Sequence, residues 1–406
     1  MPLASRPLYF ILIGTTWAAD LLVSTMLAVY YIRAAGLTPL QLAVVGIALA
    51  GSKFIFEIPT GVVADSYSRR LSIIIGALLT GGAHLLLGGF PQFSLIIIAQ
   101  LLWGLGSAFT SGATTAWIAD ELGSEDVTTI LVRGVQIGQL CGMVSIIASG
   151  FLVNLGLGVP ILLGGGLMVG LGLFLMISMT EHNFTPAQRA QRQTWQTLGA
   201  TTRAGISLLQ AQPALWFLFG ATVAYTVQGE GIERFWEAHF LANFRLPPLF
   251  GLTDVTWFSA LSIGAMLCSM AATGLTARWL QQTRCAVTTL LFWLYPLVSA
   301  CILALALART FGWGVAAFWA MVFVASPITP LFEAHLNRQL DSATRATMLS
   351  FNSQMGALGG LAGGLVLGVI ADVSLRGALV VSAAALLPAM VFMQQAVRKH
   401  KSGMVY

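Results

Sequence analysis

Long apolar runs recur along the whole of this sequence, and no other feature constrains its fold as strongly. These runs fall at 8–32, 40–60, 71–90, 93–118, 132–155, 158–179, 214–242, 253–279, 285–308, 312–337, 346–370 and 376–396. A helix of about 20 apolar residues crosses roughly 30 Å of hydrocarbon, and inside a bilayer a helix satisfies its own backbone hydrogen-bonding groups. The sequence therefore predicts an all-α membrane protein with twelve transmembrane helices.

Composition excludes an ordinary soluble protein. Hydrophobic residues make up 57% of the 406 residues and charged residues only 9%, whereas soluble domains carry about 25% charged residues. The formal net charge of +5 is therefore interpreted by where the bases lie, and no nucleic-acid partner is expected. The four cysteines show no C-x-x-C spacing, so neither a disulfide framework nor a metal site is indicated.

The order of the runs predicts two halves. Six runs are followed by a polar stretch and then by six more, which divides the chain into an N-terminal half (1–180), a linker (181–212) and a C-terminal half (213–406). This 6+6 plan is typical of transporters whose halves each contain 3+3 inverted repeats. For the linker two interpretations stay open: an amphipathic segment on the inner leaflet, or a simple tether.

The positions of the bases predict the orientation in the membrane. Lysine and arginine are enriched on the cytoplasmic side. One side has fourteen bases: Arg6, Arg69, Arg70, Arg133, Arg189, Arg192, Arg203, Arg278, Arg284, Arg338, Arg345, Arg398, Lys399 and Lys401. The other side has Arg33, Arg245, Arg309 and Arg376. We therefore expect a multi-pass protein of the inner (plasma) membrane with both termini and the linker in the cytoplasm.

One short motif lies between the second and third runs. Gly61, Asp65, Arg69 and Arg70 form a G-x-x-x-D-x-x-x-R-R pattern, preceded by Glu57 in a Glu-x-Pro-Thr-Gly stretch. The pattern resembles the loop between helices 2 and 3 of major facilitator superfamily transporters, and the preceding stretch resembles that of bacterial efflux members. Two residues differ from the usual superfamily loop: Ser66 stands where a base is usual, and Ser68 where glycine is usual.

This resemblance implies the major facilitator fold and a set of contacts at a cytoplasmic gate. Arg69 would reach Asp120 at the end of helix 4, and Asp65 would contact the start of helix 11 near Arg345. Charge pairs and helix-end dipoles of this kind differ between two conformations. The resemblance therefore implies that Gly61, Asp65, Arg69, Arg70 and Asp120 lock the cytoplasmic side in one state.

Charged residues inside the runs are the candidates for coupling or substrate contact, because each costs about 2.5–3.5 kcal/mol at membrane depth. Asp20 lies midway along the first run. In a dry cavity the pKa of such a carboxyl rises towards neutrality, which suits proton coupling or substrate contact. The other interpretation is a structural Asp hydrogen-bonded to a neighbouring helix.

The seventh run has a denser group of charges. Glu230, Glu233, Arg234 and Glu237 are spaced to share one helical face. Arg234 is expected to neutralise one acid, for example Glu230, leaving the others available. Glu237 is expected near the outer surface, where a wet outer gate or structural pairing is favoured over a coupling role. Asp20 and Glu230 occupy corresponding places in the two halves, so both halves are expected to place a carboxyl near the same depth.

Lys53 and Glu57 are spaced i, i+4 in the second run. An ion pair inside the membrane is the simplest expectation, since each charge offsets the burial of the other. Glu57 adjoins the G-x-x-x-D-x-x-x-R-R motif, so a part in conformational switching also stays open.

The leading functional hypothesis is proton-coupled efflux of small hydrophobic or amphipathic compounds by alternating access. The alternatives are a proton-coupled or facilitative metabolite importer of the same fold, and lipid translocation. No G-x-x-x-x-G-K-[ST] motif occurs and the histidines are scattered, so neither an ATP-driven pump nor an enzyme is indicated. The expected partners are a small-molecule substrate, protons and the lipid bilayer; no cofactor is expected, and the protein is expected to act as a monomer.

Overall fold

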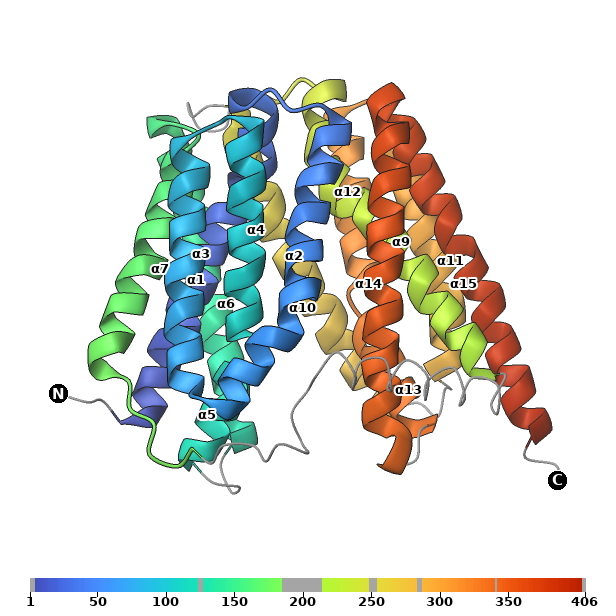
Figure 1. Cartoon of the computed structure of the whole chain (residues 1–406). Coiled ribbons are helices and arrows are strands. Elements are labelled where there is room, and N and C mark those ends of the chain that lie inside the picture. The colour runs from blue at the N-terminus through green and yellow to red at the C-terminus, as the bar shows by residue number, and fades with distance from the viewer. Residues whose placement is uncertain are drawn as a thin grey trace. The chain divides into compact units, whose positions relative to one another are not determined.

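The computed structural model describes residues 4–122, 127–184, 214–247, 254–282, 287–339 and 342–403, which are mainly helical and contain no β-strand (Figure 1). The first half consists of α1 (Ser5–Val29), the π-helix η1 (Tyr30–Ala34), α2 (Pro39–Ser66), α3 (Arg69–Gly89), α4 (Phe93–Thr110), α5 (Ala113–Leu122), α6 (Val127–Leu152), the 3-10 helix η2 (Val153–Leu155) and α7 (Val159–Ser178). The second half consists of α9 (Ala214–Asn243), the 3-10 helix η4 (Asp254–Thr256), α10 (Trp257–Gln282), α11 (Val287–Ala306), α12 (Phe311–Ala325), α13 (Ile328–Gln339), α14 (Ser342–Val373) and α15 (Leu375–Gly403).

Eleven segments of the described chain are long and apolar enough to cross a membrane. Phe93–Leu122 and Phe311–Glu333 each count as one segment, although α4–α5 and α12–α13 are interrupted helices. The 30-residue helix α9 is not among the eleven. From its midpoint onward it contains Gln228 and four charged residues, which lower its hydropathy. With α9 added, the segments correspond to the twelve predicted runs, and the predicted all-α membrane fold is confirmed.

The same packing pattern occurs twice. In the first half α1 packs on α6 and α7, and α3 packs on α4 and α7. In the second half α9 packs on α14 and α15, and α11 packs on α12 and α15. Counting α4–α5 and α12–α13 as single membrane helices, these pairs have the same positions within the order of each half. The second half therefore repeats the architecture of the first.

Packing divides the described chain into two compact units. Unit 1 is drawn from residues 1–37, 45–195 and 247–260, and unit 2 from 38–44, 196–246 and 261–406. These bounds differ from the predicted halves by two short segments at the starts of α2 and α10. In unit 2, Ala43 is fully buried with Phe235 and Leu367; in unit 1, the Thr256 hydroxyl donates to the Gly150 carbonyl over 3.4 Å. Local packing, and not position relative to the linker, assigns these two segments.

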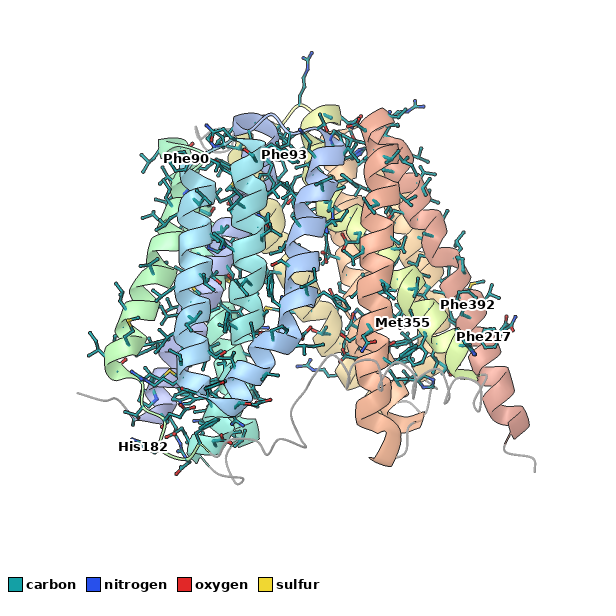
Figure 2. All side chains as sticks on the ribbon, viewed as in Figure 1. Phe90, Phe93, His182, Phe217, Met355 and Phe392 are labelled. Carbon is teal, nitrogen blue, oxygen red and sulfur yellow. The ribbon has the colours of Figure 1, made fainter. Side chains whose placement is uncertain are left out.

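Aromatic side chains join α9 to α15 in unit 2. Phe217 of α9 lies beside Phe392 of α15 (Figure 2), with ring centroids 6.3 Å apart and ring planes inclined by 42°. Tilted aromatic pairs at such separations are favourable. Gly220, one turn after Phe217, makes room for the same ring, since a Cβ added there would lie 3.0 Å from Phe392. These contacts hold the first part of α9 against the second half of α15.

Glycine lets α3 and α7 approach closely. A Cβ added at Gly81 would lie 2.7 Å from the Val169 backbone nitrogen and 2.9 Å from the Gly165 carbonyl oxygen. Both atoms belong to backbone, so no side-chain rotation relieves the clash. The next residue, Gly82, has no heavy atom within 4 Å of such a Cβ. Small residues at such contacts allow the close packing on which membrane helix association depends.

Gly81→Ala is therefore expected to destabilise unit 1 by about 1–3 kcal/mol, the usual cost of overpacking. Gly82→Ala is the matched control, and it is expected to be neutral or to stabilise α3 slightly because alanine favours the helix. Thermal unfolding of the purified variants in one detergent measures the difference. Equal melting temperatures for the two variants would contradict the close approach at Gly81.

Candidate functional site

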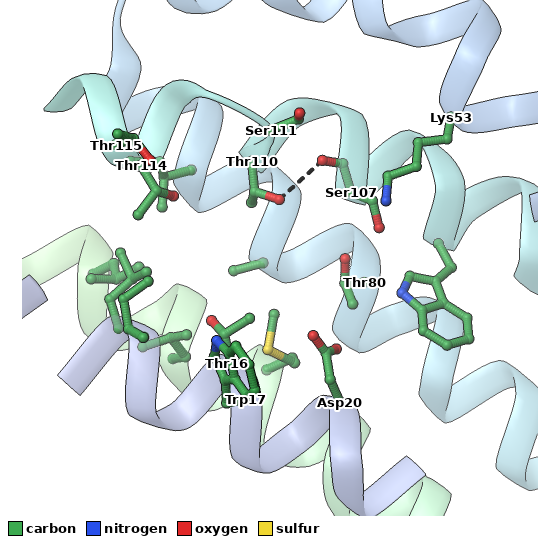
Figure 3. Close-up of a pocket in the computed structure, with 18 residues that line it drawn as sticks. Thr16, Trp17, Asp20, Lys53, Thr80, Ser107, Thr110, Ser111, Thr114 and Thr115 are labelled. Atoms are coloured by element: carbon green, nitrogen blue, oxygen red, sulfur yellow. Dashed lines mark hydrogen bonds between the residues drawn. The ribbon is translucent and has the colours of Figure 1, made fainter. Parts of the chain in front are cut away.

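An interruption in the fourth membrane helix forms one wall of a cavity in unit 1. The helix α4 ends at Thr110, and α5 begins at Ala113. Between them Gly112 has φ +72°, a left-handed conformation that glycine adopts without steric cost. Ser111, Thr114 and Thr115 lie at this break and line the cavity (Figure 3).

The cavity has a volume of about 320 Å³ and lies among α1, α2, α3, α4, α5 and α7. It is lined by Leu12, Ile13, Thr16, Trp17, Asp20, Lys53, Ile73, Ala77, Thr80, Trp103, Ser107, Thr110, Ser111, Thr114, Thr115, Met168, Leu171 and Leu175. Its volume falls within the range of about 300–1,000 Å³ that small-molecule sites occupy. We call it the α1–α4 cavity.

The α1–α4 cavity has two chemically different walls. Hydroxyl groups gather on α4 and α5, where Ser107, Thr110, Ser111, Thr114 and Thr115 line it. Apolar side chains of α3 and α7 line another side, and the indoles of Trp17 and Trp103 add aromatic surface. A cavity lined in this way suits a molecule with both polar and apolar parts.

Asp20 and Lys53 supply opposite charges to this cavity. Figure 3 shows the two side chains entering the space from different sides, Asp20 from α1 and Lys53 from α2. They form no ion pair with each other among the described residues. The expected pair between Lys53 and Glu57 is not formed there either: both residues are exposed, and Lys53 borders the cavity. Spacing along one helix places two side chains on one face but does not make them turn towards each other.

A second charged group lies on α9 in unit 2. The Nε atom of Arg234 donates to Glu230 Oε2 over 2.5 Å, and Arg234 Nη2 forms an ion pair with the same oxygen. The side chains of Arg234 and Glu230 are only 18% and 17% exposed. The contact that helical spacing predicted between Arg234 and Glu230 is therefore present.

The remaining acids of α9 lie in unlike surroundings. Glu233 is exposed, whereas Glu237 is buried and its Oε2 has no hydrogen-bond partner in the described part of the chain. A Cβ added at Gly360 of α14 would lie 3.1 Å from Glu230 Oε1, so α14 passes close to the ion pair. Helical spacing indicated a common face for these acids but not their difference in burial.

The motif between α2 and α3 forms a network at one end of unit 1. Arg69 forms an ion pair with Asp120 and also donates to the Ala116 carbonyl over 2.7 Å. Arg70 donates to the Met176 carbonyl over 2.7 Å. The contact that the resemblance implied between Arg69 and Asp120 is present. Gly61 and Asp65 lie in the last part of α2, and the side chain of Arg345 lies outside the described residues, so its expected contact with Asp65 is not described.

Glu181 belongs to the same network, although no sequence pattern pointed to it. Its carboxylate accepts hydrogen bonds from the Ser68 hydroxyl (2.5 Å), the Arg69 amide (2.8 Å) and the Arg70 amide (3.3 Å). Ser68 is also the N-cap of α3, since its hydroxyl accepts from the Leu71 amide. An anion at a helix N-terminus is favoured by the unpaired amides and the helix dipole. Ser68, in place of the usual glycine, was the one sequence feature that could have pointed to a hydrogen-bond partner such as Glu181.

Replacing Glu181 by Gln is expected to lower the free energy of unfolding by about 0.3–2 kcal/mol, because the neutral side chain loses the attraction of its charge to the N-terminus of α3 while Ser68 remains the N-cap. Glu57→Gln is a suitable control, because Glu57 is exposed and its side chain makes no hydrogen bond among the described residues. Thermal unfolding at low and high salt measures the effect, which should shrink at high salt as charges are screened. An unchanged melting temperature for Glu181→Gln would show that the charge of Glu181 contributes little to stability.

The sequence matches a profile of the Major Facilitator Superfamily over residues 8–363. A curated relative, the uncharacterized MFS-type transporter YxaM of Bacillus subtilis (strain 168), is 21% identical over 335 residues, which are 82% of this chain and 80% of that protein. Multidrug resistance protein 1 of the same organism is 31% identical over 94 residues, which are 23% of this chain and 22% of that protein.

A solved structure shares the fold. The crystal structure of the nucleoside transporter NupG is similar with a TM-score of 0.78 at 16% identity, and the likeness covers 97% of this chain and 99% of that one. At this level of identity the likeness speaks for the fold alone.

Proposed function

Since the chain belongs to the Major Facilitator Superfamily, we propose that this transporter exports small amphipathic compounds in exchange for protons by alternating access. The observation that carries the proposal is the position of Asp20. Its carboxylate faces the α1–α4 cavity from the middle of α1, beside apolar and hydroxyl surface, and forms no ion pair with Lys53 among the described residues. A carboxyl at membrane depth is costly, so its presence there marks a candidate for ligand binding or proton movement.

Exchange follows from competition at one carboxylate. An ionised Asp20 attracts a positively charged group of a substrate, whereas a protonated Asp20 does not. Substrate and proton therefore exclude each other at this group. If the cavity is open to one side of the membrane at a time, a proton that enters from outside displaces the substrate to the outside. The same proton is then carried to the cytoplasmic side, where it is released. Each ligand then shifts the conformational equilibrium by its own difference in affinity for the two states.

The ion pair on α9 supplies a second site that responds to protonation. Protonation of Glu230 would remove its charge and leave the Arg234 guanidinium without its anionic partner. The loss changes the charge near Gly360, where α14 passes close to Glu230. We assign this group, with Glu233 beside it on the same helix, to coupling in the C-terminal half.

The network of Arg69, Asp120 and Glu181 is assigned to the cytoplasmic gate, with both termini in the cytoplasm. Its contacts are charge-assisted hydrogen bonds, which are stronger than neutral ones and demand a specific geometry. A gate of this type favours two defined conformations, closed and open, over a continuous range of intermediate conformations. The inner membrane is the proposed location.

The direction of transport is proposed from the sequence around Glu57 and Gly61, which resembles efflux members of the superfamily. The partial similarity to multidrug resistance protein 1 also supports export. An importer of the same fold would use the same carboxyls for symport, and the sign of the gradient response separates the two.

The proposal is tested in inverted membrane vesicles that are acidified inside. Ethidium and radiolabelled L-phenylalanine serve as a permanent cation and a zwitterion, and vesicles without the protein serve as the control. We expect accumulation of at least one compound that collapses when the pH gradient is removed. Absence of gradient-dependent accumulation for both compounds contradicts proton-coupled efflux, and uptake only under the reversed gradient supports the importer.

A further inference from the structure

We infer that the α1–α4 cavity selects small amphipathic zwitterions, molecules that carry a protonated amine and a carboxylate on an apolar or aromatic body. The inference deepens the proposed function by naming the substrate class of the same site. It rests on that function only in treating the occupant of the cavity as the transported compound.

The two charges of the cavity select against singly charged ligands. Asp20 and Lys53 both line it, and each lacks an ion pair with the other among the described residues. A simple cation that approaches Asp20 is repelled by Lys53, and a simple anion that approaches Lys53 is repelled by Asp20. A zwitterion satisfies both, because its ammonium group pairs with Asp20 and its carboxylate with Lys53.

The hydroxyl wall provides further hydrogen bonds for such a ligand. The hydroxyls of Thr16, Ser111, Thr114 and Thr115 take part in none of the hydrogen bonds found among the described residues, although all four residues line the cavity. Serine and threonine hydroxyls both donate and accept. They are therefore able to surround either charged group of the ligand, and a wall of this kind has little value for a purely hydrophobic compound.

The apolar surface of the cavity would contact the uncharged body of the ligand. Met168, Leu171 and Leu175 of α7 line the cavity, and Trp17 and Trp103 supply aromatic faces. An indole also stacks with an aromatic ring, and this contact is favourable beyond the area buried. The volume of about 320 Å³ accommodates an aromatic amino acid. An aromatic or apolar body that carries two opposite charges thus matches each part of the lining.

Three commercially available compounds with one aromatic body test the inference. L-Phenylalanine carries both charges, phenethylamine only the cation, and 3-phenylpropionate only the anion. Equilibrium binding of each radiolabelled compound to the full-length protein in lipid nanodiscs, at equal pH on both sides, requires no gradient. We expect L-phenylalanine to bind at least tenfold more tightly than either of the other two.

Two variants assign the charges. In Lys53→Met the preference for L-phenylalanine over phenethylamine should disappear, because the partner of the carboxylate is lost. In Asp20→Asn the preference over 3-phenylpropionate should disappear, because the partner of the ammonium group is lost. Each result is a ratio of dissociation constants within one variant, so it is unaffected by the fraction of protein that folds. Glu57→Gln, one turn beyond Lys53 on the same helix, should retain both preferences.

Several outcomes would overturn the inference. Phenethylamine or 3-phenylpropionate binding as tightly as L-phenylalanine would show a singly charged site, and no measurable binding of all three would exclude this substrate class. These outcomes leave proton-coupled efflux standing if ethidium accumulates in inverted vesicles. Conversely, selective binding of L-phenylalanine without any gradient-driven accumulation would uphold the substrate class and contradict the proposed function.

Discussion

Asp20→Asn is expected to reduce gradient-driven accumulation in inverted vesicles to the level of vesicles without the protein. Asparagine has nearly the same shape but neither binds nor releases a proton at physiological pH. No group at position 20 then carries the proton that is exchanged for substrate. Affinity for a ligand with a positive charge should fall roughly 10–100-fold, because a hydrogen bond to a charged group contributes about 1.5–3 kcal/mol. Transport of the labelled compounds into inverted vesicles measures the first effect, and binding in nanodiscs measures the second.

The control for this experiment is Asp20→Glu, which keeps the carboxyl group and extends it by one methylene. It should retain a gradient response, with a changed rate. A matched surface control is Glu57→Gln, since Glu57 is exposed on α2 and does not line the cavity. Normal gradient-driven accumulation by Asp20→Asn would remove this carboxyl from coupling and direct attention to the acids of α9.

The second large effect is expected at the ion pair of α9. Arg234→Met leaves Glu230 partly buried without its partner, and breaking a buried pair in this way costs about 3–5 kcal/mol. The variant should lose transport and unfold at a lower temperature than the native protein. Glu230→Gln should lower the melting temperature less than Arg234→Met does, because the glutamine that replaces Glu230 still accepts a hydrogen bond from the longer and more flexible arginine, but it should also lose transport because it cannot ionise.

The double variant Glu230→Gln/Arg234→Met separates charge from packing. If the cost of Arg234→Met comes from the unpaired carboxylate, the double variant should recover stability, with a coupling energy of roughly 0.5–3 kcal/mol. Transport should remain impaired even when stability returns, since the proposed switch has lost both partners. Equal losses of stability in the single and double variants would mean that the arginine stem contributes mainly by packing.

The fold was largely predictable because the bilayer sets a length and a polarity that the sequence must match. Apolar runs located the membrane helices, including α9, which the run 214–242 indicated although it is not among the eleven most apolar segments of the described chain. What the runs did not show is the interruption between α4 and α5. The break at Gly112 depends on a single left-handed residue inside an apolar stretch, and apolarity continues across it.

The candidate site was predictable only where a residue type was itself unusual. A carboxyl in mid-membrane singled out Asp20, and helical spacing paired Arg234 with Glu230. Helical spacing wrongly predicted an ion pair between Lys53 and Glu57. Spacing considers only neighbours on one helix, whereas the cavity that Lys53 borders is built from several helices. Glu181 was missed for the same reason: it follows α7 but accepts a hydrogen bond from the Arg69 amide at the start of α3, and nothing local in the sequence brings those ends together.

The hydroxyl wall of the α1–α4 cavity has a consequence for how specificity diverges among related proteins. A surface that both donates and accepts hydrogen bonds places few demands on the identity of a ligand, so discrimination falls to the charged residues at its margin. A single exchange at position 53 would then redirect the protein from one charge class to another, while Asp20, to which we assign the proton, stays in place. New cargo is thereby accessible by one mutational step, without rebuilding the machinery that drives transport.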